Sequence, residues 1–225
     1  EWADPARMGF AGQFPASCGD KVWSIAPADP QQFAARAVEG MWRELGGKVT
    51  GQVRMGTTPD GVQPLMSFSS PTLGEVVRDI NKYSNNVMTQ QVLVTLGKER
   101  QGTGSLAAGR AALSQWWQTR WPAAEMPVVE NGAGLSRNAR IQAQALGHML
   151  QAAWGSSVMP EFVSSMPISG MDGTLRRSKA SANAHLKTGS LRDTNALGGY
   201  VLGNSGRRYV LVALINHPNA GGARP

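Results

Sequence analysis

The stretch Lys82-Tyr83-Ser84-Asn85-Asn86-Val87-Met88 places three small polar residues between two segments that both have helical periodicity. The segment before it opens with the capping box Thr72-Leu73-Gly74-Glu75 and continues as an apolar stripe. Beyond the stretch, apolar residues recur at every fourth position, at Met88, Val92 and Leu96. Ser and Asn side chains compete with helical hydrogen bonds, so the triplet predicts the end of one helix and the cap of the next. Its hydroxyl and amide groups would then lie in a cleft.

Further along the chain, the pattern predicts helices over residues 105–120 and 138–154. Upstream, Asp29 and Pro30 are typical of the start of a helix that ends at Gly46-Gly47. Two strand-like pieces follow at residues 49–55 and 64–69. Residues 1–28 read as an irregular segment, the tail of a preceding or inserted domain, and residues 29–225 as one further domain or part of it.

The last quarter of the chain predicts three strands, at residues 185–191, 199–202 and 209–216. The composition Asn204-Ser205-Gly206 suits a hairpin turn between the last two strands. Residues 210–215 are apolar without alternation, which predicts that both faces of this strand are covered and both edges paired. The chain offers a neighbour for one edge only, so we expect further strands outside these residues.

Lys187-Thr188-Gly189-Ser190 begins a predicted strand with an ammonium, two hydroxyls and a glycine that permits close approach. Such a set suits a pocket that holds a carboxylate. The alternative is an ordinary exposed lysine before a turn. Ser-x-Asn occurs at Ser84, Ser136 and Ser181, but only Ser84 lies between two amphipathic helices well upstream of the Lys-Thr-Gly strand.

Composition bounds the class of protein. With 225 residues, 41% of them hydrophobic, the chain can bury a sizeable core. The net charge of +7 favours an anionic partner: nucleic acid, an anionic membrane surface or an acidic wall polymer. The basic residues are scattered and not interleaved with aromatic residues, which argues against nucleic acid. No apolar run approaches the ~20 residues of a membrane span.

Cysteine and histidine content argues against a metal site. Cys18 is the only cysteine, so a disulfide within the chain and a cysteine-type zinc site are excluded. We interpret Cys18 as a buried thiol, and pairing with a cysteine outside the chain is left open. His148, His185 and His217 lack metal-ligand spacing and are interpreted as structural or surface residues, so no metal and no cofactor is predicted.

Five groups of motifs carry a resemblance to a known family. They are Ser69-Ser70-Pro71-Thr72-Leu73, Asn81-Lys82-Tyr83-Ser84-Asn85-Asn86, Glu130-Asn131-Gly132-Ala133-Gly134-Leu135-Ser136, Pro167-Ile168-Ser169-Gly170-Met171-Asp172-Gly173-Thr174-Leu175, and Lys187-Thr188-Gly189-Ser190-Leu191 with Leu197-Gly198-Gly199-Tyr200. Ser-x-Asn followed by Lys-Thr-Gly is the motif logic of penicillin-recognising serine enzymes. From about Val49 to Asn216, the chain resembles the D-alanyl-D-alanine carboxypeptidase and endopeptidase family, peptidase family S13, of the penicillin-binding protein 4 type.

The resemblance implies an α/β (α+β) transpeptidase-like fold of the penicillin-binding and β-lactamase kind, with helices on both faces of an antiparallel sheet. It implies that Ser84 and Lys187 form a proton-relay pair and that Asn86 donates to a substrate amide carbonyl. Thr188 and Ser190, with Gly189 between them, would bind the terminal carboxylate, and the Ser190 N–H would form half of an oxyanion hole. Where the family commonly has Gly-Ser-Gly-Leu-Ser, this chain has Ala133, so a hydroxyl role there is not carried over.

The chain departs from the family pattern in one respect. The family nucleophile lies in Ser-x-x-Lys, and none of the six lysines has a serine three residues earlier. We therefore expect residues 29–225 to be the C-terminal part of a penicillin-binding domain that is incomplete at its N-terminal side and inactive alone. The expected partners are peptidoglycan stem peptides, β-lactams and the missing N-terminal segment, in the periplasm or cell envelope. A homodimer is left open.

Three other functions compete with this hypothesis. A non-catalytic module of the same fold would bind muropeptide or a protein partner without chemistry, and a β-lactamase would release its acyl group fast. A basic nucleic-acid binder is the least favoured alternative.

Overall fold

The computed structural model describes residues 9, 11–22, 29–180 and 183–222. The chain forms two compact units, residues 1–68 and residues 69–225. The boundary between the units, after residue 68, lies later in the chain than the boundary predicted after residue 28. The assignment of residues 29–225 to part of a larger domain stays a prediction.

The described part of the first unit contains one α-helix, α1 (Phe33–Glu44), preceded by the short 3-10 turns η1 (Ala16–Cys18) and η2 (Pro30–Gln32). The predicted helix is thus confirmed, and Gly46 follows it with a positive φ of 86°. None of the α1 residues is buried. Cys18 is exposed, so its interpretation as a buried thiol is wrong.

The strands predicted at residues 49–55 and 64–69 are also wrong, because both segments are irregular. Neither segment pairs with another among the described residues. An extended segment becomes a stable strand only when its N–H and C=O groups find such a partner. Apolar content alone therefore misled the prediction here.

The described part of the second unit contains five α-helices: α2 (Leu73–Tyr83), α3 (Asn86–Gln101), α4 (Leu106–Arg120), α5 (Ala143–Trp154) and α6 (Met159–Ser165). The capping box predicted at Thr72 and Glu75 is present at the start of α2. Ser105 caps α4 through a hydrogen bond from the Ala108 N–H. The helices α3 and α4 pack closely where glycine replaces a side chain: a Cβ added at Gly109 would lie 2.4 Å from the Leu93 carbonyl oxygen.

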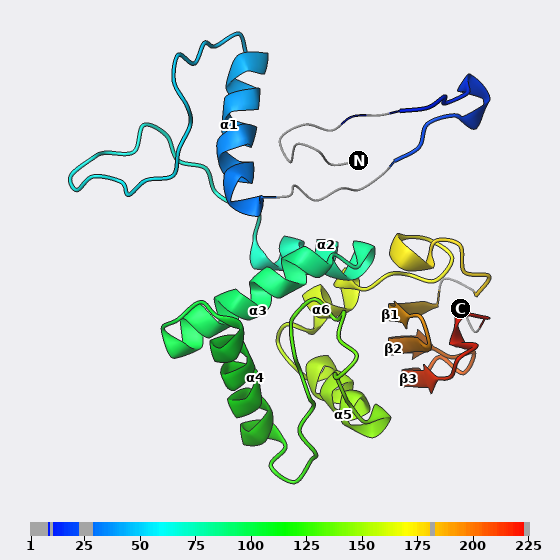
Figure 1. Ribbon diagram of the computed structural model, residues 1–225. Coiled ribbons are helices and arrows are strands. Elements are labelled where there is room, and N and C mark those ends of the chain that lie inside the picture. Colours follow the sequence, from blue (N-terminus) through cyan, green and yellow to red (C-terminus); the bar gives the residue numbers. More distant parts are fainter. Residues whose placement is uncertain (1–8, 10, 23–28, 181–182, 223–225) are drawn as a thin grey trace. The chain divides into compact units, whose positions relative to one another are not determined.

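Three antiparallel strands form the sheet in the order β1 (Ala184–Leu191), β2 (Thr194–Leu202) and β3 (Arg208–Asn216). Their register pairs Lys187 with Gly198, and Leu197 with Ala213. All three predicted strands are confirmed, and β2 begins five residues earlier than the sequence predicted because it forms a tight hairpin with β1. Helices α2 to α6 lie to one side of this sheet (Figure 1).

The alternation of side chains along each strand places a separate apolar cluster on each face of the sheet. On one face, Tyr200 packs with Leu150 of α5 and with Met166. On the other face, Leu186 and Leu175 form a smaller cluster beside the 3-10 turn η3 (Gly173–Leu175). The predicted α/β fold class with an antiparallel sheet is confirmed. Within the described residues, the second face carries only η3 and the short turn η4 (Ala220–Gly222) in place of the expected α-helices.

The strand β3 is less covered than its apolar sequence predicted. Tyr209, Leu211 and Ile215 are 51%, 38% and 40% exposed. Because β3 is the last strand in the sheet order, its outer edge has no strand partner in the part of the chain that the structure describes. The expected cover of both faces and both edges is therefore not met by these residues.

Candidate functional site

Ser84 occupies the break between α2 and α3 that the sequence predicted. It follows the last turn of α2 with φ 55° and ψ 49°, a left-handed conformation. No other non-glycine residue in the described ranges has a positive φ. Asn85 then caps α3 by accepting the Met88 N–H at 3.0 Å. This sharp turn leaves the Ser84 side chain exposed at the junction of the two helices.

Lys187 reaches Ser84 from the middle of β1. Its Nζ donates a hydrogen bond to Ser84 Oγ at 3.0 Å, although 103 positions separate the two residues in the sequence. A second hydrogen bond runs from Nζ to the Thr188 carbonyl at 2.7 Å. Burial lowers the pKa of Lys187 below its ordinary value, because desolvation disfavours the ammonium. The structure thus joins a hydroxyl to an amine that releases its proton more readily than a free lysine.

Asn86 lies beside this pair at the start of α3. With its amide oriented so that the nitrogen donates, Nδ2 lies 3.3 Å from the Ala133 carbonyl oxygen and 3.1 Å from the Ser84 carbonyl oxygen. The loop that carries Ala133 is fixed to α3, because the Gly132 N–H donates to Gln90 Oε1 at 2.8 Å. The partner of Asn86 at position 133 is therefore a main-chain group, and the side chain there is not involved.

A carboxylate organises the rest of this loop. Glu130 accepts a short hydrogen bond from the Ser136 hydroxyl and one of 3.0 Å from Asn138 Nδ2. These two hydrogen bonds, that of Ser136 first, lower the pKa of Glu130. The arrangement explains why α5 does not begin at Asn138 as predicted: Ser136 and Asn138 stabilise the loop, and the helix starts at Ala143.

The three residues after Lys187 belong to the same strand, β1. Thr188 Oγ1 lies 2.8 Å from Thr174 Oγ1, so the two hydroxyls share a hydrogen bond. A Cβ added at Gly189 would be in van der Waals contact with Ala196 Cβ at 3.4 Å. Ser190 is exposed and pairs with Asn195 in the strand register. The structure thus brings Ser84, Asn86, Lys187 and Thr188 to one region, while their roles stay predictions.

Two charged residues near Ser84 were not singled out by the sequence analysis. Lys82 is only 5% exposed and forms an ion pair of 2.6 Å with Asp172. Both belong to motifs that carry the family resemblance, and that signal alone could have drawn attention to them. At the surface, Arg137 pairs with Asp193, which links the loop after α4 to the β1–β2 turn.

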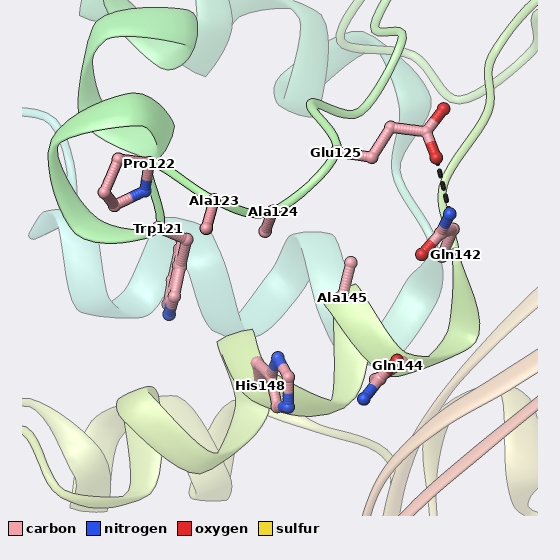
Figure 2. A pocket seen from close by; sticks show the side chains of 9 residues that line it. All are labelled: Trp121, Pro122, Ala123, Ala124, Glu125, Gln142, Gln144, Ala145 and His148. Carbon is pink, nitrogen blue, oxygen red and sulfur yellow. Dashed lines mark hydrogen bonds between the residues drawn. The ribbon is translucent and has the colours of Figure 1, made fainter.

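A surface pocket of about 550 Å³ lies between the loop after α4 and the start of α5 (Figure 2). Its lining is mixed: Trp121, Pro122 and Ala145 are apolar, and Gln144 and His148 are polar. None of the predicted site residues lines it. We therefore locate the candidate site at the hydrogen bond between Ser84 and Lys187 and not at this pocket.

The described part of the chain shows neither a metal-binding cluster nor a membrane-spanning helix. No group of three or more His, Cys, Asp or Glu side chains there is arranged to hold a metal ion. None of the described helices combines the length and apolar character needed to span a bilayer. Of the histidines, His185 Nδ1 lies 3.2 Å from the Val163 carbonyl oxygen, and His217 Nδ1 accepts the Asn219 N–H at 3.1 Å.

Comparison with known proteins gives consistent matches over nearly the whole chain. The model of the D-Ala-D-Ala carboxypeptidase 3 (S13) family matches residues 3–224. A D-alanyl-D-alanine carboxypeptidase of an Actinomadura species is 25% identical over 96% of this chain and 42% of its own length. The carboxypeptidase DacB of Mycolicibacterium smegmatis is 31% identical over 88% of this chain and 44% of its own length. The chain thus spans less than half the length of these curated relatives.

A solved structure supports the fold. Penicillin binding protein 4 (dacB) from Haemophilus influenzae, in a crystal structure with a β-lactam, superposes with a TM-score of 0.73 at 23% identity. The match covers 85% of this chain and 46% of that protein. The helices and the three-stranded antiparallel sheet therefore form part of a penicillin-binding fold.

Proposed function

Because the chain belongs to the D-Ala-D-Ala carboxypeptidase 3 (S13) family, we propose that the protein carrying it cleaves the terminal D-Ala-D-Ala bond of peptidoglycan stem peptides. D-Ala cross-links between stem peptides are a second class of substrate in this proposal. The reaction proceeds through a serine acyl-enzyme, which β-lactams trap. The net charge of +7 favours binding to the anionic cell wall, which supports location in the periplasm or cell envelope.

One observation carries this proposal: the hydrogen bond of 3.0 Å from Lys187 Nζ to Ser84 Oγ. A leaving amine needs a proton, and a hydroxyl next to an ammonium delivers one through a short relay. The relay works near neutral pH only when the lysine releases its proton readily, and burial lowers the pKa of Lys187. The arrangement supports Ser84 and Lys187 as the catalytic proton-relay pair.

The neighbouring residues take the roles of substrate binding. Asn86 donates to an amide carbonyl of the substrate, which replaces one of the two main-chain carbonyls that its amide nitrogen faces. Thr188 and Ser190 bind the terminal carboxylate, which replaces Thr174 as a partner of the Thr188 hydroxyl. Gly189 lets the substrate backbone come close to the strand, and the Ser190 N–H stabilises the oxyanion. An oxyanion donor of this kind contributes about 3 kcal/mol in comparable acyl-transfer sites.

The nucleophile of the proposed reaction is not among these residues, because no Ser-x-x-Lys occurs in the sequence. We assign it to a segment outside the chain, and residues 29–225 to the C-terminal part of the penicillin-binding domain. The greater length of the curated relatives supports this assignment. The chain alone would then bind substrate weakly and turn over none.

A covalent penicillin probe tests the proposal on the full-length gene product. Fluorescent penicillin is expected to label the protein and to stay attached. Lys187→Met should slow labelling by about 10²- to 10⁴-fold, the usual contribution of a positioned acid–base group. The matched control is Lys98→Met, since Lys98 is exposed on α3 and its ammonium donates to the nearby Gly102 carbonyl. It should label like the wild type.

The other outcomes separate the rival functions. If the full-length product takes up no label, the enzyme proposal fails and a non-catalytic muropeptide- or partner-binding module is the better account. If nitrocefin is turned over rapidly, with fast loss of label, the protein is a β-lactamase. If Lys187→Met and Lys98→Met label at the same rate, the hydrogen bond from Lys187 to Ser84 has no role in catalysis.

A further inference from the structure

Lys82 lies in the last turn of α2, two residues before Ser84. It is buried, with 5% of its surface exposed. Its Nζ donates to the Met166 carbonyl at 2.7 Å and to Asp172 Oδ2 at 2.6 Å. A buried ammonium without partners is strongly unfavourable, so Lys82 keeps this position only while both acceptors stay in place.

Asp172 in turn holds the loop that contains it. Its Oδ1 accepts the Ile168 N–H at 2.7 Å, while Oδ2 accepts from Lys82. Burial raises the pKa of this carboxyl, but the Ile168 N–H and the Lys82 ammonium together lower it below its ordinary value. The carboxylate therefore stays charged at neutral pH and ties the loop over residues 166–172 to the end of α2.

The same loop is joined to β1 on its other side. The Leu186 N–H donates to the Pro167 carbonyl at 2.9 Å, and the Ser169 N–H donates to the Ala184 carbonyl at 3.0 Å. Leu186 directly precedes Lys187. The loop thus stands between the helix that carries Ser84 and the strand that carries Lys187, with hydrogen bonds to both.

Two further contacts restrict movement of the loop against α2. Asn81 Nδ2 donates to Ser165 Oγ at 2.7 Å. Gly173 has a φ of +54°, and a Cβ added there would lie 2.5 Å from the Lys82 carbonyl oxygen. The residues on either side of the loop are therefore in close contact with the end of α2, which restricts movement of the loop along it.

We infer that Lys82 and Asp172 are positioning residues for the proposed reaction: the ion pair between the buried Lys82 and the partly exposed Asp172 sets the distance between Ser84 Oγ and Lys187 Nζ. This inference rests on the proposed function of that pair. Ser84 is exposed and sits in a left-handed turn, so the contacts of its neighbours determine where its hydroxyl points. A hydrogen bond weakens steeply with length and angle, and a displacement of about 1 Å can slow a positioned reaction by about 10²-fold.

Removal of the ion pair should change the chemistry at Lys187 and not only the stability. When the loop separates from α2, water reaches Lys187, and its pKa rises towards the ordinary value because desolvation is the cause of its lowering. The pH profile of acylation should then shift to higher pH. A purely structural ion pair would lower the melting temperature and leave the pH profile of the folded protein unchanged.

The experiment compares Lys82→Met, Asp172→Asn and the double variant in the full-length gene product. The labelling rate with fluorescent penicillin is measured against pH at a temperature where circular dichroism shows each variant folded. Lys82→Met should label about 10- to 100-fold more slowly, with its profile shifted to higher pH. The double variant should resemble Lys82→Met alone, because residues that act as one unit are not additive. Lys82→Arg keeps the charge and should restore part of the rate.

The control is Arg43→Met, which removes an ion pair of similar length, 2.6 Å to Glu39, from an exposed helix face. It should match the wild type in rate and profile. If Lys82→Met does not fold, Asp172→Asn and Lys82→Arg carry the test. An unchanged rate and pH profile in the folded variants would overturn the inference.

Direct titration separates this inference from the proposed function. In protein labelled with ¹⁵N at the lysine side chains, the signal of Lys187 is identified by its loss in Lys187→Arg and then titrated in the wild type and in Lys82→Met. A higher Lys187 pKa in Lys82→Met supports positioning even if penicillin labels nothing, an outcome that would remove only the proposed function. Identical titration curves would show that the ion pair does not act on Lys187.

Discussion

The left-handed conformation of Ser84 predicts that glycine at this position gives a more stable protein than alanine, the reverse of the usual order in a helix. In an ordinary helix, Ala is more stable than Gly by about 1 kcal/mol. At φ 55° and ψ 49°, however, a Cβ meets the following carbonyl oxygen, which costs roughly 1–2 kcal/mol that Gly does not incur. Because Ser84→Ala and Ser84→Gly both remove the hydroxyl bound to Lys187, their difference isolates the backbone.

We expect Ser84→Gly to be more stable than Ser84→Ala by about 0.5–1 kcal/mol, after the greater freedom of Gly in the unfolded chain is subtracted. The measurement is the urea midpoint at equal m-value. Gln91→Ala and Gln91→Gly are the matched control, because Gln91 is an exposed position inside α3. There Ala should be the more stable by about 1 kcal/mol. If Ala is at least as stable as Gly at position 84, the turn is not left-handed in solution and the reasoning fails.

Two further predictions concern packing and pH. Gly109→Ala should destabilise the protein by about 1–3 kcal/mol, because the new Cβ would lie 2.4 Å from the Leu93 carbonyl oxygen. The control is Gly147→Ala on an open side of α5, which should be neutral or stabilise by up to about 1 kcal/mol. Equal urea midpoints for Gly109→Ala and the wild type would show that α3 and α4 are not in contact. The Ile168 N–H and the Lys82 ammonium lower the pKa of Asp172 below its ordinary value of 3.8, so its stabilising effect is present above about pH 4 and is lost as the pH falls through the folded pKa. The melting temperature of Asp172→Asn should therefore lie below that of the wild type at pH 6, and the gap should narrow below pH 4; a constant gap would contradict the ionised carboxylate.

The sequence was sufficient where local chemistry determines local structure. The Ser84-Asn85-Asn86 triplet predicted a break between two helices because such side chains compete with helical hydrogen bonds, and the structure has the break at those residues. The apolar residues of β1 to β3 predicted the strands for a similar reason. The order of Ser84 and Lys187 in the chain also predicted that the two would meet, but only through the family resemblance.

Features that depend on distant partners could not be predicted. Lysine is rarely buried, so nothing in the local sequence indicates that Lys82 is enclosed by Met166 and Asp172, more than eighty positions away. The strands expected at residues 49–55 and 64–69 failed for the complementary reason, since strand pairing depends on a partner that the described chain does not supply. The proposed nucleophile could not be predicted either, because the sequence contains no Ser-x-x-Lys.

The main-chain partner of Asn86 has a consequence for protein engineering. Because the Ala133 carbonyl oxygen makes the contact, any L-amino acid that keeps the local backbone can stand at position 133 without loss of that hydrogen bond. Residue 133 is therefore suited to saturation mutagenesis: a library there varies the side chain next to this hydrogen bond while the main-chain group that Asn86 contacts stays the same.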